Sequence, residues 1–192
     1  MAENRTLEER MSPEERQLFE KYRSKIGQEF TPEDGHQMFF PLLNDGDIRW
    51  SLIKKWAIVN DDTNPLWFDE EYAKSSRWGG IIAPPLFLLT ISDGAVPAAS
   101  PVVDLYYPLP ECVMNRERYP NFRGSMQANS EWEFFEPVRP GDRITAKAKL
   151  TDIYWKQGKR FRLLFAFGET SYTNQKGHLV ACCRAGAVYL FK

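Results

Sequence analysis

Residues 81–91 have the sequence IIAPPLFLLTI, which is apolar on every side. The two prolines, Pro84 and Pro85, stand near the start of this stretch, where the first turn of a helix tolerates proline. A helix without a polar face has to be buried. The sequence therefore predicts that residues 81–91 form a central helix, with Gly79 and Gly80 breaking the chain just before it.

The part of the chain that follows is rich in strand formers, and we expect four strands there. They lie at residues 130–135, 143–153, 161–172 and 179–191. The sequence NQKG at residues 174–177 is typical of a hairpin turn between the last two strands. Long antiparallel strands after one very apolar helix predict an α+β fold, because the sheet has to bury one face.

Two shorter helices are expected before the central one. Ser12 followed by Pro-Glu-Glu is typical of a capped helix start, and Gly27 is typical of a helix end. Asp47 is a second candidate N-cap, for a helix that runs to about residue 60. The apolar face of that helix would consist of Ile48, Leu52, Ile53, Trp56, Ala57 and Val59. Residues 69–74 could add a short helical turn after it.

We expect one domain over residues 1–192, since the sequence contains no internal repeat and no low-complexity linker. Residues 1–46 would supply the N-terminal helix and a lead-in. Residues 97–127 are Pro-rich and irregular, and a segment of this length in a compact domain is typical of a functional flap. We expect this flap to cover a ligand groove.

The composition is that of an ordinary globular protein. Of the 192 residues, 43% are hydrophobic and 27% are charged, and the net charge of -1 argues against nucleic acid or an anionic membrane as a bulk partner. No stretch approaches the roughly 20 apolar residues of a membrane span. Three cysteines suggest no disulfide framework, and the acid-rich N-terminus is unlike a signal peptide, which together favour the cytoplasm. Neither the cysteines nor the two histidines, His36 and His178, have the spacing of a metal site.

Residues 59–69, VNDDTNPLWFD, resemble the hydratase motif of the MaoC-like family, which is Gly-Asp-x-Asn-Pro-hydrophobic-His-x-Asp. Three further segments resemble other parts of the same family in the same order: RWGGIIAPP at residues 77–85, EWEFFEPVRPGD at 131–142 and YTNQKGHLVA at 172–181. Together the four segments extend over most of residues 48–185. Within the family, the chain resembles the N-terminal type of half found in fungal fatty-synthase-like dehydratase domains.

The resemblance implies a hotdog fold, in which an antiparallel β-sheet wraps around a central apolar helix. It also implies that water is added to or removed from a trans-2-enoyl or β-hydroxyacyl thioester of coenzyme A or acyl carrier protein, with no cofactor besides that carrier. In this family an Asp and a His hold and activate the water. A backbone N–H near the start of the central helix binds the thioester oxygen as it gains negative charge.

The motif places Asp62 on the catalytic Asp of the family, although a turn Asp beside Asn-Pro is an equally good interpretation. Trp67 stands where the family has its catalytic His, and an indole N–H donates but cannot transfer a proton near neutral pH. Pro84 falls where the family has the Gly whose N–H binds the thioester oxygen, and proline has no N–H. Ala83 or Leu86 is the alternative donor.

The same match yields a candidate set of substrate-binding residues. The set consists of Asn64, Trp67, Gly80, Ile82, Ala83 and Pro84. Asn64 would mainly shape the turn together with the proline that follows it. Three arginines, Arg77, Arg139 and Arg143, could meet coenzyme phosphates, although solvation of the surface is the simpler interpretation.

The leading hypothesis is that this chain is the non-catalytic, acyl-binding subunit of a heteromeric acyl-thioester hydratase or dehydratase, because Trp67 replaces the His. Hotdog domains resemble one another in that the sheets of two domains pair edge to edge. The expected partner is therefore a second MaoC-like hotdog subunit, in a heterodimer or heterotetramer, or a second copy of the chain in a homodimer. Two alternatives stay open. One is a self-sufficient hotdog thioesterase in which Asp62, Asp61 or Asp69 activates water, and the other is a binding module without chemistry.

Overall fold

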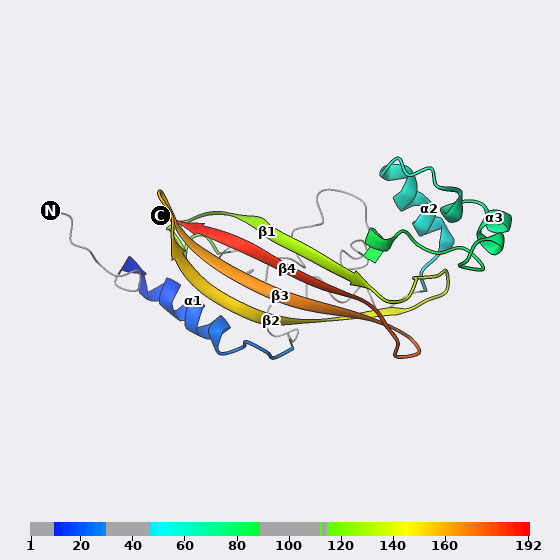
Figure 1. The fold of residues 1–192 in the computed structure, drawn as a ribbon. Helices are drawn as coiled ribbons and strands as arrows, with labels where there is room; N and C mark the ends of the chain where they lie inside the picture. The colour runs from blue at the N-terminus through cyan, green and yellow to red at the C-terminus, as the bar shows by residue number, and fades with distance from the viewer. Residues whose placement is uncertain (1–9, 30–46, 89–111, 113–114) are drawn as a thin grey trace.

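The structure is a computed structural model that describes residues 10–29, 47–88, 112 and 115–192 (Figure 1). Its main feature is one antiparallel sheet of four strands in the order β1-β4-β3-β2. The strands are β1 (Phe122–Phe134), β2 (Ile144–Gln157), β3 (Arg162–Asn174) and β4 (Leu179–Phe191). Because helices from the N-terminal half pack on this sheet, the predicted α+β class is confirmed.

The first strand begins earlier than the sequence pattern predicted. β1 starts at Phe122, so residues 122–127 belong to the sheet and not to the flap expected over residues 97–127. Of the rest of that flap, residues 97–111 and 113–114 lie outside the described part of the chain. β1 is an edge strand with mostly exposed side chains, so its sequence lacks a regular apolar alternation. Main-chain pairing with β4 holds it in the sheet.

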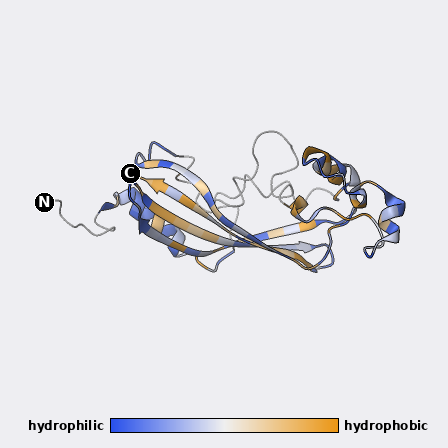
Figure 2. Ribbon diagram, turned by 45° about the horizontal axis from the view of Figure 1, so that its top comes forward, coloured by the Kyte–Doolittle hydropathy of each residue, from blue (hydrophilic) through white to orange (hydrophobic). Residues whose placement is uncertain are grey.

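β4 is the most buried strand and lies between β1 and β3. Figure 2 shows its hydrophobic residues along the middle of the sheet. The hairpin turn before β4 is confirmed. Gly177 has a left-handed backbone (φ 80°), and its N–H donates to the carbonyl of Asn174 (2.9 Å).

The N-terminal helix α1 (Pro13–Arg23) begins as the sequence predicted. The Ser12 hydroxyl accepts from the Glu15 N–H (3.2 Å), and the Glu15 carboxylate accepts from the Ser12 N–H (3.1 Å), which forms a capping box. The helix ends before Gly27, so the predicted end was too late. Gly27 instead carries the chain to the edge of the sheet, where its N–H donates to the carbonyl of Leu150 in β2 (2.8 Å).

A buried ion pair holds α1 on the sheet. Glu15 and Arg162, the first residue of β3, are 1% and 3% exposed, and the guanidinium donates to both carboxylate oxygens (2.5 and 3.0 Å). Arg162 also donates to the carbonyl of Lys192 (2.8 Å), and the Asn121 side chain donates to Glu15 (3.2 Å). Each charge is met inside the protein, so removing one partner would leave the other buried and uncompensated.

The helix α2 (Trp50–Val59) forms without the expected cap. Arg49 stands at the N-cap position and contributes no side-chain hydrogen bond to the helix. The prediction that Asp47 caps this helix was therefore wrong. Its carboxylate lies 2.7 Å from Nε of Arg143 and holds that side chain instead.

Only part of the expected apolar face of α2 is buried. Ile53 and Ala57, one helical turn apart, are inaccessible to solvent, whereas Leu52 is 38% and Val59 is 71% exposed. Ile58 is 68% exposed as well. The last turn of α2 therefore presents apolar side chains to solvent directly before the motif.

Three short elements follow α2. They are η4 (Pro65–Trp67), α3 (Glu70–Ser75) and η5 (Pro85–Phe87). The short helical turn predicted at residues 69–74 is confirmed as α3, which Asp69 caps by accepting from the Tyr72 N–H (3.0 Å). The expected central helix does not start at residue 81, because residues 81–84 have no regular secondary structure and η5 comes after them. Leu88 is helical, and residues 89–91 lie outside the described part of the chain.

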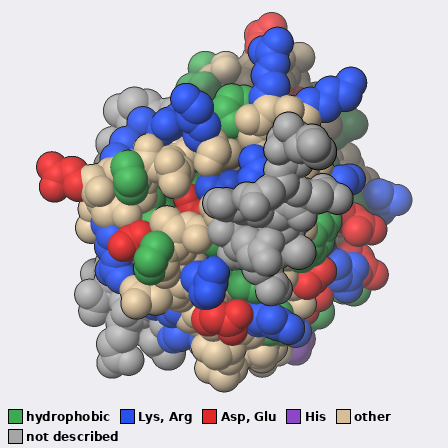
Figure 3. Space-filling model, turned by 90° about the vertical axis from the view of Figure 1, so that its left-hand side faces the viewer, with side chains coloured by type: hydrophobic (Ala, Val, Ile, Leu, Met, Phe, Trp, Pro, Cys, Tyr) green, Lys and Arg blue, Asp and Glu red, His purple; other side chains and the backbone are tan. Residues whose placement is uncertain are grey.

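Two clusters of buried side chains lie at opposite ends of the sheet, one with α1 and the other with α2 (Figure 1). The helix-end core consists of Leu18, Tyr22, Cys112, Tyr119, Phe122, Leu150, Ile153, Leu164, Ala166, Ala187, Tyr189 and Phe191. The motif-end core consists of Ile48, Ile53, Ala57, Leu66, Trp67, Ala73, Ile81, Ile82, Ala83, Phe87, Leu88, Val138, Ile144, Tyr172, Val180, Ala181, Cys183 and Ala185. Viewed from the end that carries α1, the surface shows charged side chains of both signs among scattered hydrophobic ones (Figure 3).

A row of charged side chains crosses the sheet. Glu169 of β3 lies 2.8 Å from the Lys149 ammonium of β2 and 3.0 Å from Nε of Arg184 in β4. Arg184 in turn lies 3.8 Å from Glu133 of β1. The hydrogen bond from Lys149 lowers the pKa of Glu169, with a smaller contribution from Arg184, and outweighs the opposing effect of burial.

We expect Glu15→Gln to lower the free energy of unfolding by about 3–5 kcal/mol, because Arg162 is left charged in a buried site. Urea unfolding of the variant measures this loss. The matched control is Glu20→Gln on the same helix, because the Glu20 side chain is 62% exposed and lies 3.9 Å from Arg23. It should change the free energy by less than about 1 kcal/mol. Equal, small losses in both variants would show that the buried pair does not anchor α1.

The lowered pKa of Glu169 predicts a pH-dependent contribution to stability. The pKa in the folded chain lies below the ordinary value of 4.5, so the stabilisation is present above that value and is lost as the pH falls through the lowered pKa. We expect Glu169→Gln to lower the free energy of unfolding by about 0.5–1 kcal/mol near neutral pH, because the partners are partly solvated. Denaturant unfolding over a pH series should show this difference vanish in acid.

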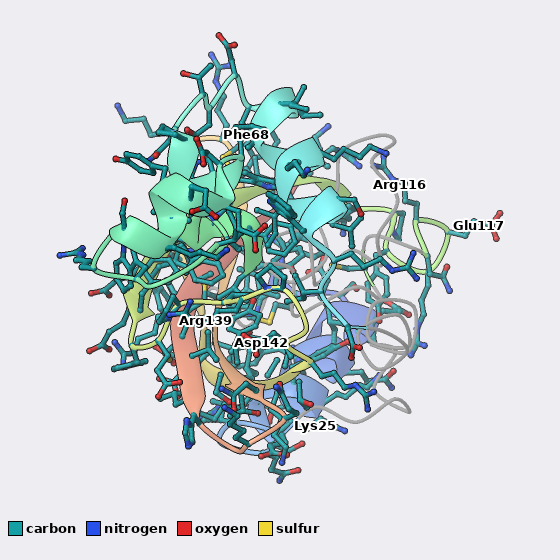
Figure 4. All side chains as sticks on the ribbon, turned by 90° about the vertical axis from the view of Figure 1, so that its right-hand side faces the viewer. Lys25, Phe68, Arg116, Glu117, Arg139 and Asp142 are labelled. Atoms are coloured by element: carbon teal, nitrogen blue, oxygen red, sulfur yellow. The ribbon has the colours of Figure 1, made fainter. Side chains whose placement is uncertain are left out.

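The control for this series is Glu117→Gln, because the Glu117 side chain is exposed and points away from the molecule (Figure 4). It should match the wild type at every pH. A difference between Glu169→Gln and the wild type that persisted in acid would contradict the pKa assignment.

Candidate functional site

The motif loop begins where α2 ends. Asp61 has a left-handed backbone (φ 53°), and the Asp62 N–H donates to the carbonyl of Ala57 (2.9 Å). The half-buried Asp62 carboxylate accepts from the Asn64 N–H (3.1 Å), and the Asn64 side chain accepts from the Leu66 N–H (3.0 Å). These bonds make both polar side chains part of the turn that starts η4. The Asp62 carboxylate keeps further lone pairs that a water could use.

Trp67 ends η4 and is 6% exposed. Its carbonyl accepts from Nε1 of Trp50 (2.7 Å), which joins η4 to the first turn of α2. Its own Nε1 is buried and has no hydrogen-bond partner in the described part of the chain. A buried donor without an acceptor costs about 1–3 kcal/mol. The residue in the histidine position is thus a core side chain with one unmet N–H and no capacity for proton transfer.

Two of the three candidate donors for a thioester oxygen are unavailable. Pro84 has no N–H, and the Ala83 N–H donates to the carbonyl of Val138 (2.7 Å). Leu86, the first residue after the two prolines that carries an N–H, is the remaining candidate.

The candidate substrate-binding residues fall into two groups. Trp67, Ile82 and Ala83 belong to the motif-end core, and Pro84, which follows them, is also buried. Asn64 is exposed and Gly80 is half-buried, so neither is part of that core. The structure therefore brings the apolar members of the set to the motif end of the sheet.

The three arginines make different contacts, all of them within the chain. Arg139 and Asp142 lie together in the turn after β1, where the Arg139 N–H donates to the Asp142 carboxylate (2.8 Å) (Figure 4). The Arg139 guanidinium donates to the carbonyl of Trp78 (2.8 Å). Arg143 is held in its ion pair with Asp47, and Arg77 stacks over the Trp78 ring, 4.5 Å from its centroid. Arg139 has a clear structural task, since it ties this turn to the segment before residue 81.

His178 does not supply the missing acid and base group at this end. His178 lies in the hairpin turn, is exposed and pairs with Glu136 (3.2 Å), and His36 lies outside the described residues. In the described ranges no group of three or more His, Cys, Asp or Glu side chains could hold a metal ion. None of the helices in those ranges is long and apolar enough to cross a membrane.

Sequence reasoning missed two residues that shape the site. Trp50 fixes the Trp67 carbonyl, and Val138 takes the Ala83 N–H. An aromatic residue at a helix start, or a valine between prolines and charges, gives no signal for such pairing. Only the spatial approach of β1 and its turn to residues 81–84 reveals the second contact.

The family described as "FAS1-like, dehydratase domain region" matches residues 44–182, which is more than half of the chain. A UPF0336 protein of Streptomyces avermitilis is 26% identical over 114 residues, which are 59% of this chain and 67% of that protein. The 3-oxo-4,17-pregnadiene-20-carboxyl-CoA hydratase alpha subunit of Mycobacterium tuberculosis is 23% identical over 140 residues, which are 73% of this chain and 41% of that subunit. The chain thus spans well under half the length of the hydratase subunit.

Two solved structures are similar in fold. The ChsH1-ChsH2 complex of Mycobacterium tuberculosis gives a TM-score of 0.62 at 20% identity, covering 76% of this chain and 79% of the matched chain. The MaoC-like dehydratase of Rhodospirillum rubrum gives a TM-score of 0.53 at 21% identity, covering 77% of this chain and 87% of that one. At these identities the likeness shows the fold alone. The hotdog fold expected from the sequence is confirmed.

We expect Asp62→Ala to lower the free energy of unfolding by about 1 kcal/mol, because the Asn64 N–H loses its acceptor. Asp62→Asn keeps an oxygen in place and should change it by less than about 0.5 kcal/mol. Urea unfolding of both variants makes the comparison. Two variants as stable as the wild type would remove Asp62 from the turn, and two equally damaged variants would show that its charge, not its acceptor oxygen, stabilises the loop.

Proposed function

The chain belongs to the FAS1-like dehydratase family, and from this premise we propose that it is the acyl-binding, non-catalytic subunit of a heteromeric acyl-thioester hydratase or dehydratase. The substrate is a trans-2-enoyl or 3-hydroxyacyl thioester of coenzyme A or acyl carrier protein. The partner subunit supplies the acid and base groups and holds the thioester. This chain holds the acyl group.

The observation that carries the proposal is the buried, apolar environment of Trp67. The position that holds the histidine of the family motif is occupied by an indole that is 6% exposed and packed among apolar side chains. An indole is a donor only and cannot act as a general acid or base near neutral pH. General acid and base catalysis contributes about a hundred- to ten-thousandfold to rates, so this half lacks a large part of the chemistry.

The second support is that two of the candidate donors for the thioester oxygen are unavailable. Pro84 has none to offer, and the Ala83 N–H is already bonded to Val138. Loss of one such donor alone costs about a hundred- to a thousandfold in rate. Asp62 would then stand without its proton-transfer companion, and the Leu86 N–H would be the one candidate donor left for the thioester oxygen in the described part of the chain. A complete site has to come from another subunit.

The edges of the sheet favour a hotdog partner beside β1. On the β2 edge, the Gly27 N–H donates to Leu150, and Glu29 forms a bridge with Lys149, so part of that edge is already covered. β1 carries mostly exposed side chains and pairs on one side only, with β4, in the part of the chain that the structure describes. An open edge strand is a site for pairing with another sheet.

The relatives fit a heteromeric arrangement. One matched protein is named as the alpha subunit of a hydratase, and the matched structures include the ChsH1-ChsH2 complex. The HadBC dehydratase complex of Mycobacterium tuberculosis is also similar, with a TM-score of 0.50.

We place the proposed heteromer in the cytoplasm, because Cys112, Cys182 and Cys183 are buried and form no disulfide.

The test measures the hydration of a short and a long trans-2-enoyl-CoA, which is monitored as a loss of the enoyl absorbance. It uses this chain alone, its co-purifying partner alone, and the two together. We expect turnover that needs both subunits or is at least about a hundredfold faster with both, because the acid and base groups and the acyl site lie in different chains. Robust hydration by this chain alone would overturn the proposal.

Two variants sharpen the assay. Trp67→His in the chain alone should stay inactive, because the donors at residues 83 and 84 are still missing. Activity gained by that variant would show that the histidine was the only missing part. Steady release of free thiol from acyl-CoA by the chain alone, abolished by Asp62→Asn, would replace the proposal with a thioesterase.

A further inference from the structure

The sheet has a second face that points away from both buried clusters. Leu164 and Ala166 of β3 belong to the helix-end core, and neighbouring residues of a strand point to opposite faces. The second face, here called the outer face, therefore carries Phe165 and Phe167. Strand pairing adds further apolar residues to it, namely Tyr154, Leu163, Val188 and Leu190. Tyr154 is 40% exposed and both phenylalanines are half-buried, so solvent reaches this apolar group.

Three rings of the outer face form a flat apolar surface. The rings of Tyr154, Phe165 and Phe167 lie within 22° of parallel, with centroids between 5.2 and 6.3 Å apart. The Phe167 ring extends over Gly186 of β4, where a Cβ atom would stand 2.5 Å from the ring. Glycine at this position lets the ring lie on the neighbouring strand. A continuous exposed apolar surface of this kind marks a site of association with another protein.

The order of side chains across the outer face fits a second copy of the same chain. One line of paired residues runs from β1 to β2 through Met126, Val188, Phe165 and Tyr154 (Figure 1). Its first half is aliphatic and its second half is aromatic. If a second sheet is stacked on the first and related to it by a two-fold axis parallel to the strands, the line meets its own reverse. Tyr154 then faces Met126 of the other copy, which is a favourable pairing of an aromatic ring with sulfur.

The charged row beside this line has the same property. From β1 to β2 it consists of Glu133, Arg184, Glu169 and Lys149, so the signs of its charges alternate. The same axis reverses the row and places every charge opposite an unlike one, with Glu133 facing Lys149 of the other copy. A two-fold axis along the row would instead place each charge on its like. The row thus selects the axis that also brings the apolar lines together.

We propose that two copies of this chain associate through their outer faces, with the two-fold axis parallel to the strands and between β3 and β4. Two sheets stacked in this way keep their strands within about 30° of each other. Four strands about 4.8 Å apart and 13 residues long give a face of about 800 Å², which is what each partner contributes to a stable interface of ordinary size. The β1 edge lies outside this contact. The interface therefore neither requires nor blocks a hotdog subunit at that edge, and it does not rest on the proposed function.

Two complementary charge-reversal variants test the contact by sedimentation of the purified full chain over a dilution series. The first is Glu131→Lys/Glu133→Lys, since Glu131 pairs with Arg184 in register and lies on the same face. The second is Lys149→Glu. In each variant alone the reversed charges meet like charges, and we expect the dissociation constant between the two copies to rise about a hundredfold. An equimolar mixture of the two variants should restore the wild-type mass, because each reversed charge then faces an unlike one.

The matched controls are Glu117→Lys and Lys176→Glu, which make the same changes of charge at exposed positions outside the outer face. Each should keep the wild-type mass. A further variant, Met126→Lys, changes an apolar residue of the outer face whose side chain is 53% exposed, so the fold should tolerate it. It should halve the mass at concentrations where the wild type is associated. This variant keeps the test decisive if Lys149→Glu fails to fold.

A wild-type chain that sediments with its single-chain mass of 22.3 kDa throughout the dilution series would overturn the inference. The same conclusion would follow from charge-reversal variants or a Met126→Lys variant that keep the wild-type mass, or from a mixture of folded variants that does not regain it. None of these results changes hydration by the heteromer, which is measured separately. Failure of this interface and failure of the proposed function are therefore distinguishable.

Discussion

The turn at residues 137–142 holds the motif end of the molecule together. The Val138 carbonyl accepts from the Ala83 N–H, and the Asp142 carbonyl accepts from the Ile48 N–H. The Gly141 N–H returns a bond to the Ile48 carbonyl. Hydrophobic contacts have no direction, so these main-chain bonds set where α2 and residues 81–88 lie against the sheet. The motif follows α2 in the chain, so these bonds also help to place it.

The same bonds limit the chemistry of this end. A main-chain N–H has one hydrogen to donate, and at Ala83 it stabilises the fold. Pro84, the next residue, has no N–H, so it cannot add a second donor there. Trp50 adds a further constraint, because its bond to the Trp67 carbonyl fixes η4 under α2. In this chain the Ala83 N–H and the Trp67 carbonyl form hydrogen bonds that stabilise the fold.

The sequence predicted those features that follow from local chemistry or from a periodic pattern. The cap at Ser12 and the hairpin turn at Gly177 depend on neighbours in the chain, and both were found. The predicted start of β1 was wrong, because an edge strand is held by main-chain pairing rather than by an apolar pattern. The prediction of Asp47 as a helix cap was also wrong, because its ion pair depends on Arg143, far along the chain. In the site, the loss of proton transfer was visible in the sequence, but the occupied N–H of Ala83 was not.

A hotdog half that has lost its chemistry can keep its binding role because the two depend on different physical requirements. Proton transfer needs particular groups within hydrogen-bond reach, so a single change at residue 67 removes it. Acyl binding needs apolar surface of suitable shape, and an indole adds to that surface. The one conflict is the indole N–H of Trp67, which is buried and has no acceptor in the described part of the chain.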